Sequence, residues 1–249
     1  MRIVAIIPSR YKSTRFEGKP LALIDGRPMI QHVYERVNDA ESISDVFVAT
    51  DDDRIMAAVR DFGGKAILTS PENRSGTDRA ADAAEKIGLS MDDIVVNVQG
   101  DQPLIDSRCL DTLTSPFLKN PDLKMSTLAF KIVNPRELTD PKDVKVVFDK
   151  DGFALYFSRS PLPCSRDNDR DFDTYKHLGA YAYTREFLEI YRNLPEGRLE
   201  NIEKLEQLRV LEFGHRIKVM VTEHDSPEVD LPEDIRRVEE ILCTTHGTA

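Results

Sequence analysis

A group of cationic side chains stands out in a chain that is acidic as a whole. Residues 8–20 contain four cations against one acid, and this stretch includes Arg10, Arg15, Gly18 and Lys19. Arg and Lys form charge-assisted hydrogen bonds with phosphate oxygens, and a glycine lets the backbone come close to a ligand. The stretch therefore predicts a phosphate-binding loop, although a solvated basic surface loop would have the same composition.

The loop does not match the two common phosphate-binding motifs. A P-loop would need Gly at position 13 and Ser or Thr at position 20, where the chain has Ser13 and Pro20. No G-x-G-x-x-G motif follows a predicted strand, which argues against a dinucleotide-binding fold.

A carboxylate with a fixed position follows the apolar run 94–98. Asp101 lies between Gly100 and residues 102–103, directly after the predicted strand end. Magnesium in nucleotide enzymes is typically held by one or two carboxylates together with substrate phosphates. Asp230 is a candidate for the second carboxylate. Turn formation would equally explain Asp101, and helix N-capping would explain Asp230.

Alternating strands and helices should position these residues in the first half of the chain. Apolar runs predict strands over 3–7, 46–49, 66–68 and 94–98. Between them we predict helices that begin at Pro28, cover 51–62, and run from a cap at Thr77-Asp78 to Ile87. This order predicts a parallel sheet covered by helices on both faces. Its ligands should bind beyond the carboxyl ends of the strands.

The second half is richer in β-structure. Strands are predicted over 124–132, 144–148, 153–157 and 217–221, with a hairpin turn over 149–152. Helices are predicted over 185–193 and 202–213, and a final helix is expected to begin with Asp230 as its cap. We expect a single domain over 1–249, in which 1–123 and 200–249 form a nucleotide- and metal-binding core and 124–199 form a β-rich lobe.

Composition excludes several classes of protein. The 249 residues contain 34 Lys and Arg against 44 Asp and Glu, a net charge of −10, which argues against a nucleic-acid binder. Cys109, Cys164 and Cys243 are too few and too scattered for a disulfide framework or a zinc cluster. We expect no signal peptide and no membrane-spanning helix, and hence a cytoplasmic protein.

Several short strings of residues, taken together in order, resemble the cytidylyltransferases that activate 3-deoxy-manno-octulosonate (Kdo). The resemblance covers nearly the whole chain and is carried by Ile7-Pro8-Ser9-Arg10, Ser13-Thr14-Arg15, Gly18-Lys19-Pro20-Leu21, Ser75-Gly76-Thr77-Asp78-Arg79, Asn97-Val98-Gln99-Gly100-Asp101, Ala154-Leu155-Tyr156-Phe157-Ser158-Arg159, His177-Leu178-Gly179, Leu205-Glu206-Gln207-Leu208-Arg209 and Val229-Asp230 with Pro232-Glu233-Asp234. It implies a Rossmann-like nucleotidyltransferase fold of the α/β class, with a largely parallel central sheet flanked by helices and a smaller mixed β-rich lobe. The implied reaction is the transfer of CMP from CTP to the anomeric hydroxyl of a 3-deoxy-octulosonic acid, with release of pyrophosphate, for lipopolysaccharide biosynthesis.

The resemblance also implies a role for individual residues. It implies a catalytic set made of Arg10, Lys19, Asp101 and Asp230, in which Mg²⁺ would be held by Asp101 and Asp230. The triphosphate would be held by Arg10, Arg15 and Lys19, and the cytidine by Ser75, Gly76 and Thr77. The sugar acid would be bound by Gln99, Arg159, His177, Tyr181, Glu206 and Gln207.

Each sugar-binding residue also has a plainer interpretation. Arg159 could bind a carboxylate through two hydrogen bonds, or be a surface arginine. His177 could bond a sugar hydroxyl, titrate near neutrality, or be structural. Tyr181 could alternate with Tyr183 on a strand. Leu205, Leu208 and Leu211 mark a buried helical face that leaves Glu206 and Gln207 free to face a ligand, while Glu206 could also pair with Arg209.

The chain departs from the family pattern in three places. The family commonly has Glu at Gln102, Leu-Pro at Phe16-Glu17 and Thr at Leu231. A branch that uses the 8-amino-8-deoxy form of Kdo resembles this chain over residues 99–103 and around Lys176-His177, so both sugars stay open. A sialic-acid type of cytidylyltransferase and a non-catalytic nucleotide-sugar binding module are the alternatives. The family tends to form homodimers, and residues 144–157 are a plausible place for the contact.

Overall fold

A computed structural model describes residues 1–12, 15–167 and 172–246, with side chains as far as Cys243. Ser13 and Thr14, which belong to one of the family strings, lie outside the described residues. The chain divides into two compact units, Met1–Asp111 with Ser226–Ala249 (unit 1) and Thr112–Asp225 (unit 2). The boundary lies inside helix α4 (Ser107–Lys119), whereas the predicted lobe covers 124–199. The expectation that the chain forms a single domain stays a prediction.

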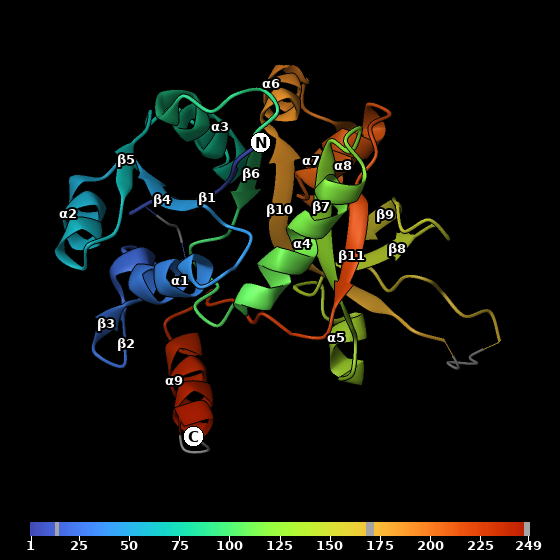
Figure 1. Ribbon diagram of the computed structural model, residues 1–249. Helices are drawn as coiled ribbons and strands as arrows, with labels where there is room; N and C mark the ends of the chain where they lie inside the picture. Colours follow the sequence, from blue (N-terminus) through green and yellow to red (C-terminus); the bar gives the residue numbers. More distant parts are fainter. Residues whose placement is uncertain (13–14, 168–171, 247–249) are drawn as a thin grey trace. The chain divides into compact units, whose positions relative to one another are not determined.

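Unit 1 contains a parallel sheet of four strands in the order β6-β1-β4-β5 (Figure 1). The strands are β1 (Ile3–Ser9), β4 (Asp45–Thr50), β5 (Ala66–Leu68) and β6 (Ile94–Asn97). Every residue of β6 is buried, as is typical of a parallel sheet covered on both faces. The four strands predicted for this half are confirmed.

The helices of unit 1 connect these strands in sequence. They are α1 (Met29–Asn38), α2 (Asp53–Asp61) and α3 (Gly76–Ile87), and α9 (Asp234–His246) ends the described chain. A 3₁₀ turn, η1 (Lys19–Leu21), and a short hairpin of β2 (Leu23–Ile24) and β3 (Arg27–Pro28) precede α1. The chain runs from β1 to β4 to β5 in one direction and then returns to β6, so right-handed crossovers place α3 on the opposite face from α1 and α2. The strand order therefore reverses between β1 and β6, which is where open α/β sheets bind ligands.

Two predicted helix caps are wrong. Helix α3 begins earlier than expected: Ser75 Oγ accepts a hydrogen bond from the Asp78 backbone N, and the Asp78 carboxylate accepts one from the Ser75 N, which is a capping box. Helix α9 begins four residues after Asp230, because the Asp234 carboxylate accepts hydrogen bonds from the backbone of Asp230 and Leu231. The side chain of Asp230 is thus left for other contacts.

Unit 2 contains a mixed set of strands. They are β7 (Met125–Lys131), β8 (Lys145–Phe148), β9 (Ala154–Ser158), β10 (Tyr175–Thr184) and β11 (Lys218–Thr222). Strand β11 is parallel to β7, whereas the β7–β10, β10–β8 and β8–β9 pairs are antiparallel. The predicted hairpin between β8 and β9 is confirmed, with Gly152 at φ +75° in its turn. These strands form the mixed β-rich lobe that the family resemblance implied.

The helices of unit 2 are α5 (Pro135–Thr139), α6 (Arg185–Asn193), α7 (Arg198–Glu203) and α8 (Gln207–Glu212). The prediction of one helix over 202–213 is wrong. The chain breaks at Lys204, whose φ of 55° is left-handed, so the segment becomes two short helices. The Arg209 side chain joins them through hydrogen bonds of 2.7 and 2.5 Å to the carboxylate of Glu200.

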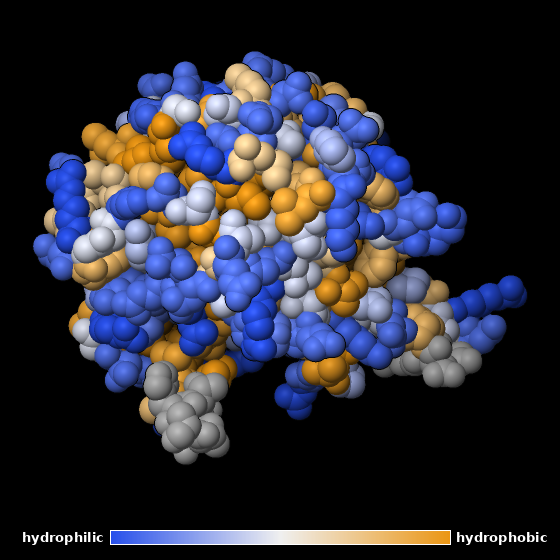
Figure 2. Space-filling model, in the orientation of Figure 1, coloured by the Kyte–Doolittle hydropathy of each residue, from blue (hydrophilic) through white to orange (hydrophobic). Residues whose placement is uncertain are grey.

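Hydrophilic side chains predominate on the face seen in Figure 2, with hydrophobic ones interspersed among them. This agrees with the acidic composition. In the parts of the chain that are described, no helix is long and apolar enough to cross a membrane.

Candidate active site

Two cations of the predicted phosphate loop contact the two predicted metal-binding carboxylates. Lys19 Nζ lies 2.6 Å from Asp101 Oδ2 and 4.0 Å from Asp230 Oδ1, and it donates a hydrogen bond of 3.0 Å to the Val229 carbonyl. Arg15 Nη1 lies 2.9 Å from Asp230 Oδ2. Residues 215 positions apart in the sequence thus form one charged cluster, which we call the Lys19 cluster: Arg15, Lys19, Asp101 and Asp230.

The fold places this cluster beside the point where the strand order reverses. Lys19 lies in the loop after β1, and Asp101 follows β6. The backbone of Val229 donates a hydrogen bond of 2.9 Å to the Asp101 carbonyl, and the Val229 side chain is fully buried in the core of unit 1. Asp230 is therefore held beside Asp101, because the preceding residue, Val229, is fixed by this backbone hydrogen bond and by its buried side chain.

Two glycines allow the surrounding loops to pack closely. A Cβ on Gly100 would lie 2.9 Å from Ser9 Oγ and 3.3 Å from the Pro8 carbonyl, too close to be accommodated without movement. A Cβ on Gly76 would lie 3.3 Å from Pro8 and 3.8 Å from Gln99 Oε1. The ends of β1 and β6 and the first turn of α3 therefore meet at one edge of unit 1. This edge brings together the predicted cytidine-binding residues Ser75 and Gly76 with Gln99, whereas Thr77 is buried.

Arg10 belongs to the same edge but not to the Lys19 cluster. Its guanidinium donates a hydrogen bond to the carbonyl of Asn73, in the loop that leads into α3. Arg15 and Lys19 thus rest on carboxylates that a phosphate could replace. Arg10 has further N–H groups besides the one donated to Asn73, so it could bind a phosphate while keeping this contact.

Sequence reasoning missed one carboxylate of this region, Glu228. Gln102 Nε2 donates a hydrogen bond of 3.3 Å to Glu228 Oε1, and Gln102 is itself buried. Desolvation by the surrounding protein and the charges of Asp101 and Asp230 raise the pKa of Glu228 above its ordinary value. Its position two residues before Asp230 is the only signal in the sequence that could have found it.

The residues present fit a divalent cation that is shared with a substrate. Asp101 Oδ1 is buried and accepts no hydrogen bond from any residue that the structure describes, so this oxygen is an available ligand. Over residues 1–12, 15–167 and 172–246 no group of three or more His, Cys, Asp or Glu could hold a metal by itself. A pair of carboxylates completed by phosphate oxygens is the arrangement that Mg²⁺ favours.

In unit 2, a hydrogen-bond chain orients His177 and places a proton on its Nε2. Thr127 Oγ1 donates its one hydrogen to the Ala180 carbonyl at 2.8 Å, so it must accept at 2.8 Å from His177 Nε2. The shifted register of β10 between Leu178 and Tyr181 accompanies this contact. Desolvation lowers the pKa of His177 to about 3. The imidazole is therefore neutral, with its proton on Nε2 and Nδ1 left as an acceptor, rather than titrating near neutrality.

His177 lies in a row of aromatic rings. Its ring centroid lies 5.1 Å from that of Phe157 and 5.3 Å from that of Tyr181, which is followed by Tyr183 at 5.9 Å. Tyr181 is 9% exposed, so only an edge of it can meet a ligand. Both predicted sugar-binding residues of β10 thus lie together.

Arg159 is held by the segment that links α7 to α8. Its Nε donates 2.7 Å to the Glu203 carbonyl, Nη1 donates 2.8 Å to the Pro141 carbonyl, and Nη2 lies 3.4 Å from the Lys204 carbonyl. These bonds use three of the five N–H groups of a guanidinium, which leaves two for a ligand. Glu203 also binds the Arg159 backbone through its carboxylate at 3.0 Å. Sequence reasoning did not single out Glu203.

Glu206 and Gln207 differ in exposure. Tyr191 donates a hydrogen bond of 3.5 Å to the half-buried Glu206, and burial together with this carboxylate raises the pKa of Tyr191. Gln207 is 4% exposed, so it belongs to the buried face that Leu205 and Leu208 also form, contrary to the expected outward direction. Arg209 pairs with Glu200.

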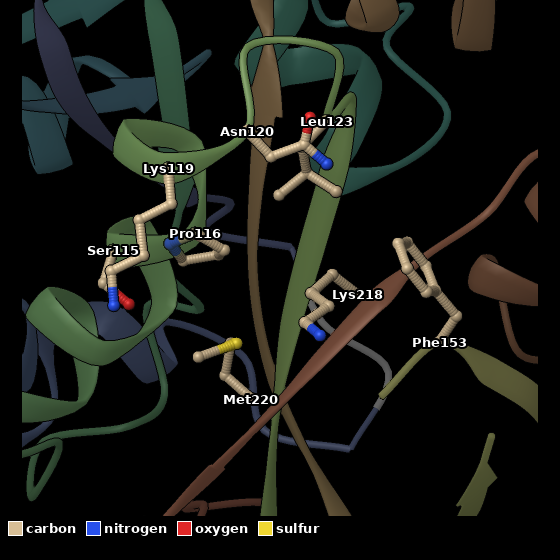
Figure 3. A pocket seen from close by; sticks show the side chains of 8 residues that line it. All are labelled: Ser115, Pro116, Lys119, Asn120, Leu123, Phe153, Lys218 and Met220. Carbon is tan, nitrogen blue, oxygen red and sulfur yellow. The ribbon is translucent and has the colours of Figure 1, made fainter. Parts of the chain in front are cut away.

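Unit 2 contains a cavity of about 320 Å³ whose lining includes none of the predicted site residues (Figure 3). It lies between the end of α4 and strand β11, and it is lined by Ser115, Pro116, Lys119, Asn120, Leu123, Phe153, Lys218 and Met220.

Comparison with known proteins agrees with this geometry. A family profile described as cytidylyltransferase matches residues 4–217. A 3-deoxy-manno-octulosonate cytidylyltransferase of Desulfatibacillum aliphaticivorans is 63% identical over 97% of this chain and 99% of its own length. An 8-amino-3,8-dideoxy-manno-octulosonate cytidylyltransferase of Shewanella baltica (strain OS155) is 56% identical over 98% of this chain and 99% of its own.

A solved structure is also closely similar. A CMP:2-keto-3-deoxy-manno-octonic acid synthetase complexed with CTP superposes with a TM-score of 0.92 at 42% identity, over 98% of this chain and 100% of the other. The profile, the sequence relatives and the fold agree, and the α/β nucleotidyltransferase fold implied by the sequence is confirmed. The chain belongs to the cytidylyltransferase family, in the group of CMP-Kdo synthetases that includes the 8-amino-Kdo cytidylyltransferases.

Proposed function

We propose that this protein transfers CMP from CTP to the anomeric hydroxyl of a 3-deoxy-octulosonic acid and releases pyrophosphate, as a step in lipopolysaccharide biosynthesis. The observation that carries the proposal is the Lys19 cluster, where cations suited to a triphosphate lie against two carboxylates suited to its metal. Relatives of 63% and 56% identity over nearly the whole chain carry the names of such enzymes.

Arg10, Arg15 and Lys19 would bind the triphosphate. Each now donates to an acceptor on the protein, the Asn73 carbonyl for Arg10 and carboxylates for the other two. Phosphate oxygens form charge-assisted bonds with Arg15 and Lys19 in place of the carboxylates. They can also bond the N–H groups of Arg10 that are not donated to Asn73. The cations would neutralise charge on the phosphates and hold the α-phosphate in line with the attacking hydroxyl, which is most of what phosphoryl-group chemistry needs. Ser75, Gly76 and Thr77 would position the cytidine.

Asp101 and Asp230 would hold Mg²⁺. When bound, the metal would neutralise phosphate charge and lower the pKa of the attacking hydroxyl. Asp101 Oδ1 is the oxygen best prepared for this role, because it is buried and lacks a hydrogen-bond partner among the described side chains and backbone.

Four side chains of unit 2 would bind the sugar acid, and Gln99 of unit 1 keeps the sugar-binding role that the family resemblance implies. Neutral His177 offers Nδ1 to a hydroxyl, Arg159 offers two N–H groups to the carboxylate, and Tyr181 and Glu206 add polar atoms. Gln207 can take part only if a neighbour moves, because it is buried.

The identity of the sugar is tested by steady-state kinetics with Kdo and with its 8-amino-8-deoxy analogue at matched CTP and Mg²⁺. We expect kcat/KM for one of them to exceed that for the other at least about tenfold, because a buried polar site discriminates strongly between a hydroxyl and an amine. Turnover with a sialic acid alone, or CTP binding without pyrophosphate release, would refute the proposal.

A cytoplasmic location and a homodimer complete the proposal. Fractionation of the cells and sedimentation of the purified protein test them, and a monomer at micromolar concentration would contradict the second.

A further inference from the structure

The loop that leads into α3 is built around one carboxylate of that helix. Asp82 Oδ2 accepts a hydrogen bond of 2.7 Å from the Ser70 backbone N and one of 2.9 Å from Asn73 Nδ2. The other oxygen, Oδ1, lies 3.1 Å from Lys86 Nζ, one turn further along the helix. The Asn73 amide also donates 3.1 Å to the Ser70 carbonyl. Asp82 therefore closes a compact turn over residues 70–73.

The same turn presents a backbone acceptor to Arg10. The carbonyl of Asn73 accepts a hydrogen bond from the Arg10 guanidinium, while its side-chain Nδ2 donates to Ser70 and Asp82. Asp82 thus reaches Arg10 through a single intermediate residue, although the two lie far apart in the sequence. Arg10 itself is half-buried at the end of β1.

A second residue of α3 fixes the start of this loop. Arg79 is fully buried, its Nη1 donates 2.5 Å to Thr69 Oγ1, and its Nη2 lies 3.2 Å from Asp51 Oδ2. Arg79 and Asp82 are neighbours on one helix face. Side chains of α3 thus contact the loop at Thr69, at Ser70 and at Asn73. These three contacts fix the loop to the helix.

We propose that Asp82 is a positioning residue for CTP binding, which acts by fixing Asn73 so that its carbonyl orients the Arg10 guanidinium toward the triphosphate. The proposal rests on the proposed function, in which Arg10 binds phosphate. An arginine that is already oriented loses less side-chain entropy when the nucleotide binds. Asp82 touches neither the nucleotide nor a reacting atom in this role.

The test is a double-mutant cycle between Asp82→Asn and Arg10→Met, because residues that act through one another are not additive. CTP affinity is measured by calorimetry, together with kcat and KM for CTP. We expect D82N to weaken CTP binding about fivefold and to raise KM for CTP by a similar factor, with kcat changed less than twofold. In the Arg10→Met background the effect of D82N should vanish.

Lys19→Met provides the matched control background. Lys19 is a cation of the same loop, but its hydrogen bonds and ion pairs with described residues go to Asp101, Val229 and Asp230 rather than to the turn around Asn73. D82N should therefore retain its full fivefold effect in this background. An equal effect of D82N in the presence and absence of Arg10 would overturn the inference.

A second variant guards against misfolding of D82N. Asn73→Ala removes the amide that Asp82 holds and keeps the carbonyl that Arg10 needs. It should reproduce the loss of CTP affinity and the dependence on Arg10, and an unchanged CTP affinity for a folded Asn73→Ala protein would also overturn the inference. Pyrophosphate release by the wild-type protein is measured in parallel: its absence refutes the proposed function, whereas wild-type turnover with an additive cycle refutes only the role of Asp82.

Discussion

Replacing His177 with Gln should make the protein less sensitive to acid. In the folded protein the His177 pKa is about 3, because desolvation disfavours the charged ring, whereas in the unfolded chain it returns to 6.5. Below pH 6.5 the unfolded state therefore binds a proton that the folded state does not. Stability from this residue is fully present above pH 6.5 and falls as the pH decreases toward 3.

The size of the effect follows from the two pKa values. Each pH unit between them lowers the free energy of unfolding by at most about 1.4 kcal/mol, so lowering the pH from 8 to 5 costs at most about 2 kcal/mol. His177 keeps partial exposure to solvent, and screening reduces the expected loss to about 1 kcal/mol. Gln cannot titrate, and its amide can still donate to Thr127.

Urea denaturation of the wild type and of His177→Gln at pH 8 and pH 5, without metal or nucleotide, measures this difference. The wild type should lose about 1 kcal/mol more than the variant over this interval. Thr127→Val is the matched control: it removes the buried partner of His177 without adding or removing a titrating group, so it should lower stability at both pH values. Equal losses for the wild type and His177→Gln would refute the neutral, desolvated imidazole.

Three further substitutions test the packing and charges around the site. Glu200→Gln should cost about 3 kcal/mol of unfolding free energy in urea, because it leaves the Arg209 guanidinium, with a side chain 12% exposed, without its carboxylate; a loss below about 1 kcal/mol would contradict the buried pair. Ser75→Ala should cost about 1 kcal/mol in the same assay through loss of the α3 cap, and an unchanged midpoint would contradict the capping box. Lys19→Met should tighten Mn²⁺ binding about fivefold in electron paramagnetic resonance titrations without nucleotide, because it removes the cation held by Asp101. Equal or weaker binding would show that the carboxylates do not form a cation site.

The strands of unit 1 could be predicted from the sequence because they are buried on both faces. Short continuous apolar runs such as Ile3–Ile7 are typical of strands in the interior of a parallel sheet, and the predicted end of α3 at Ile87 is confirmed. Helix starts were harder, since several residues near a terminus can cap it. At α3 the capping box makes Ser75 the N-cap instead of Thr77. The helix break at Lys204 depends on a left-handed backbone conformation, which the spacing of the Leu residues does not indicate. Strand β10 was indicated only by the spacing of Tyr181 and Tyr183, because its buried positions include the charged Lys176, which pairs with Glu137 and Asp225.

The sequence indicated which residues belong to the site, but not which of them contact one another. The charges of the loop after β1 and the position of Asp101 follow from local sequence, so both were visible. The pairing of Arg15 with Asp230 depends on the whole topology of unit 1, and only the family resemblance connected them in advance. Glu228 has no signal in the sequence beyond its position near Asp230, since its raised pKa arises from neighbours that the fold supplies.

Pyrophosphate release from CTP in the presence of Mg²⁺ and a 3-deoxy-octulosonic acid tests the central claim most directly. The wild-type protein should release one pyrophosphate for each CMP-sugar formed, with Kdo or its 8-amino analogue as acceptor. Asp101→Ala should reduce this rate at least about 100-fold while the protein stays folded, because a carboxylate that would hold Mg²⁺ is lost. No pyrophosphate from the wild type with either sugar acid, or undiminished turnover by Asp101→Ala, would contradict the account.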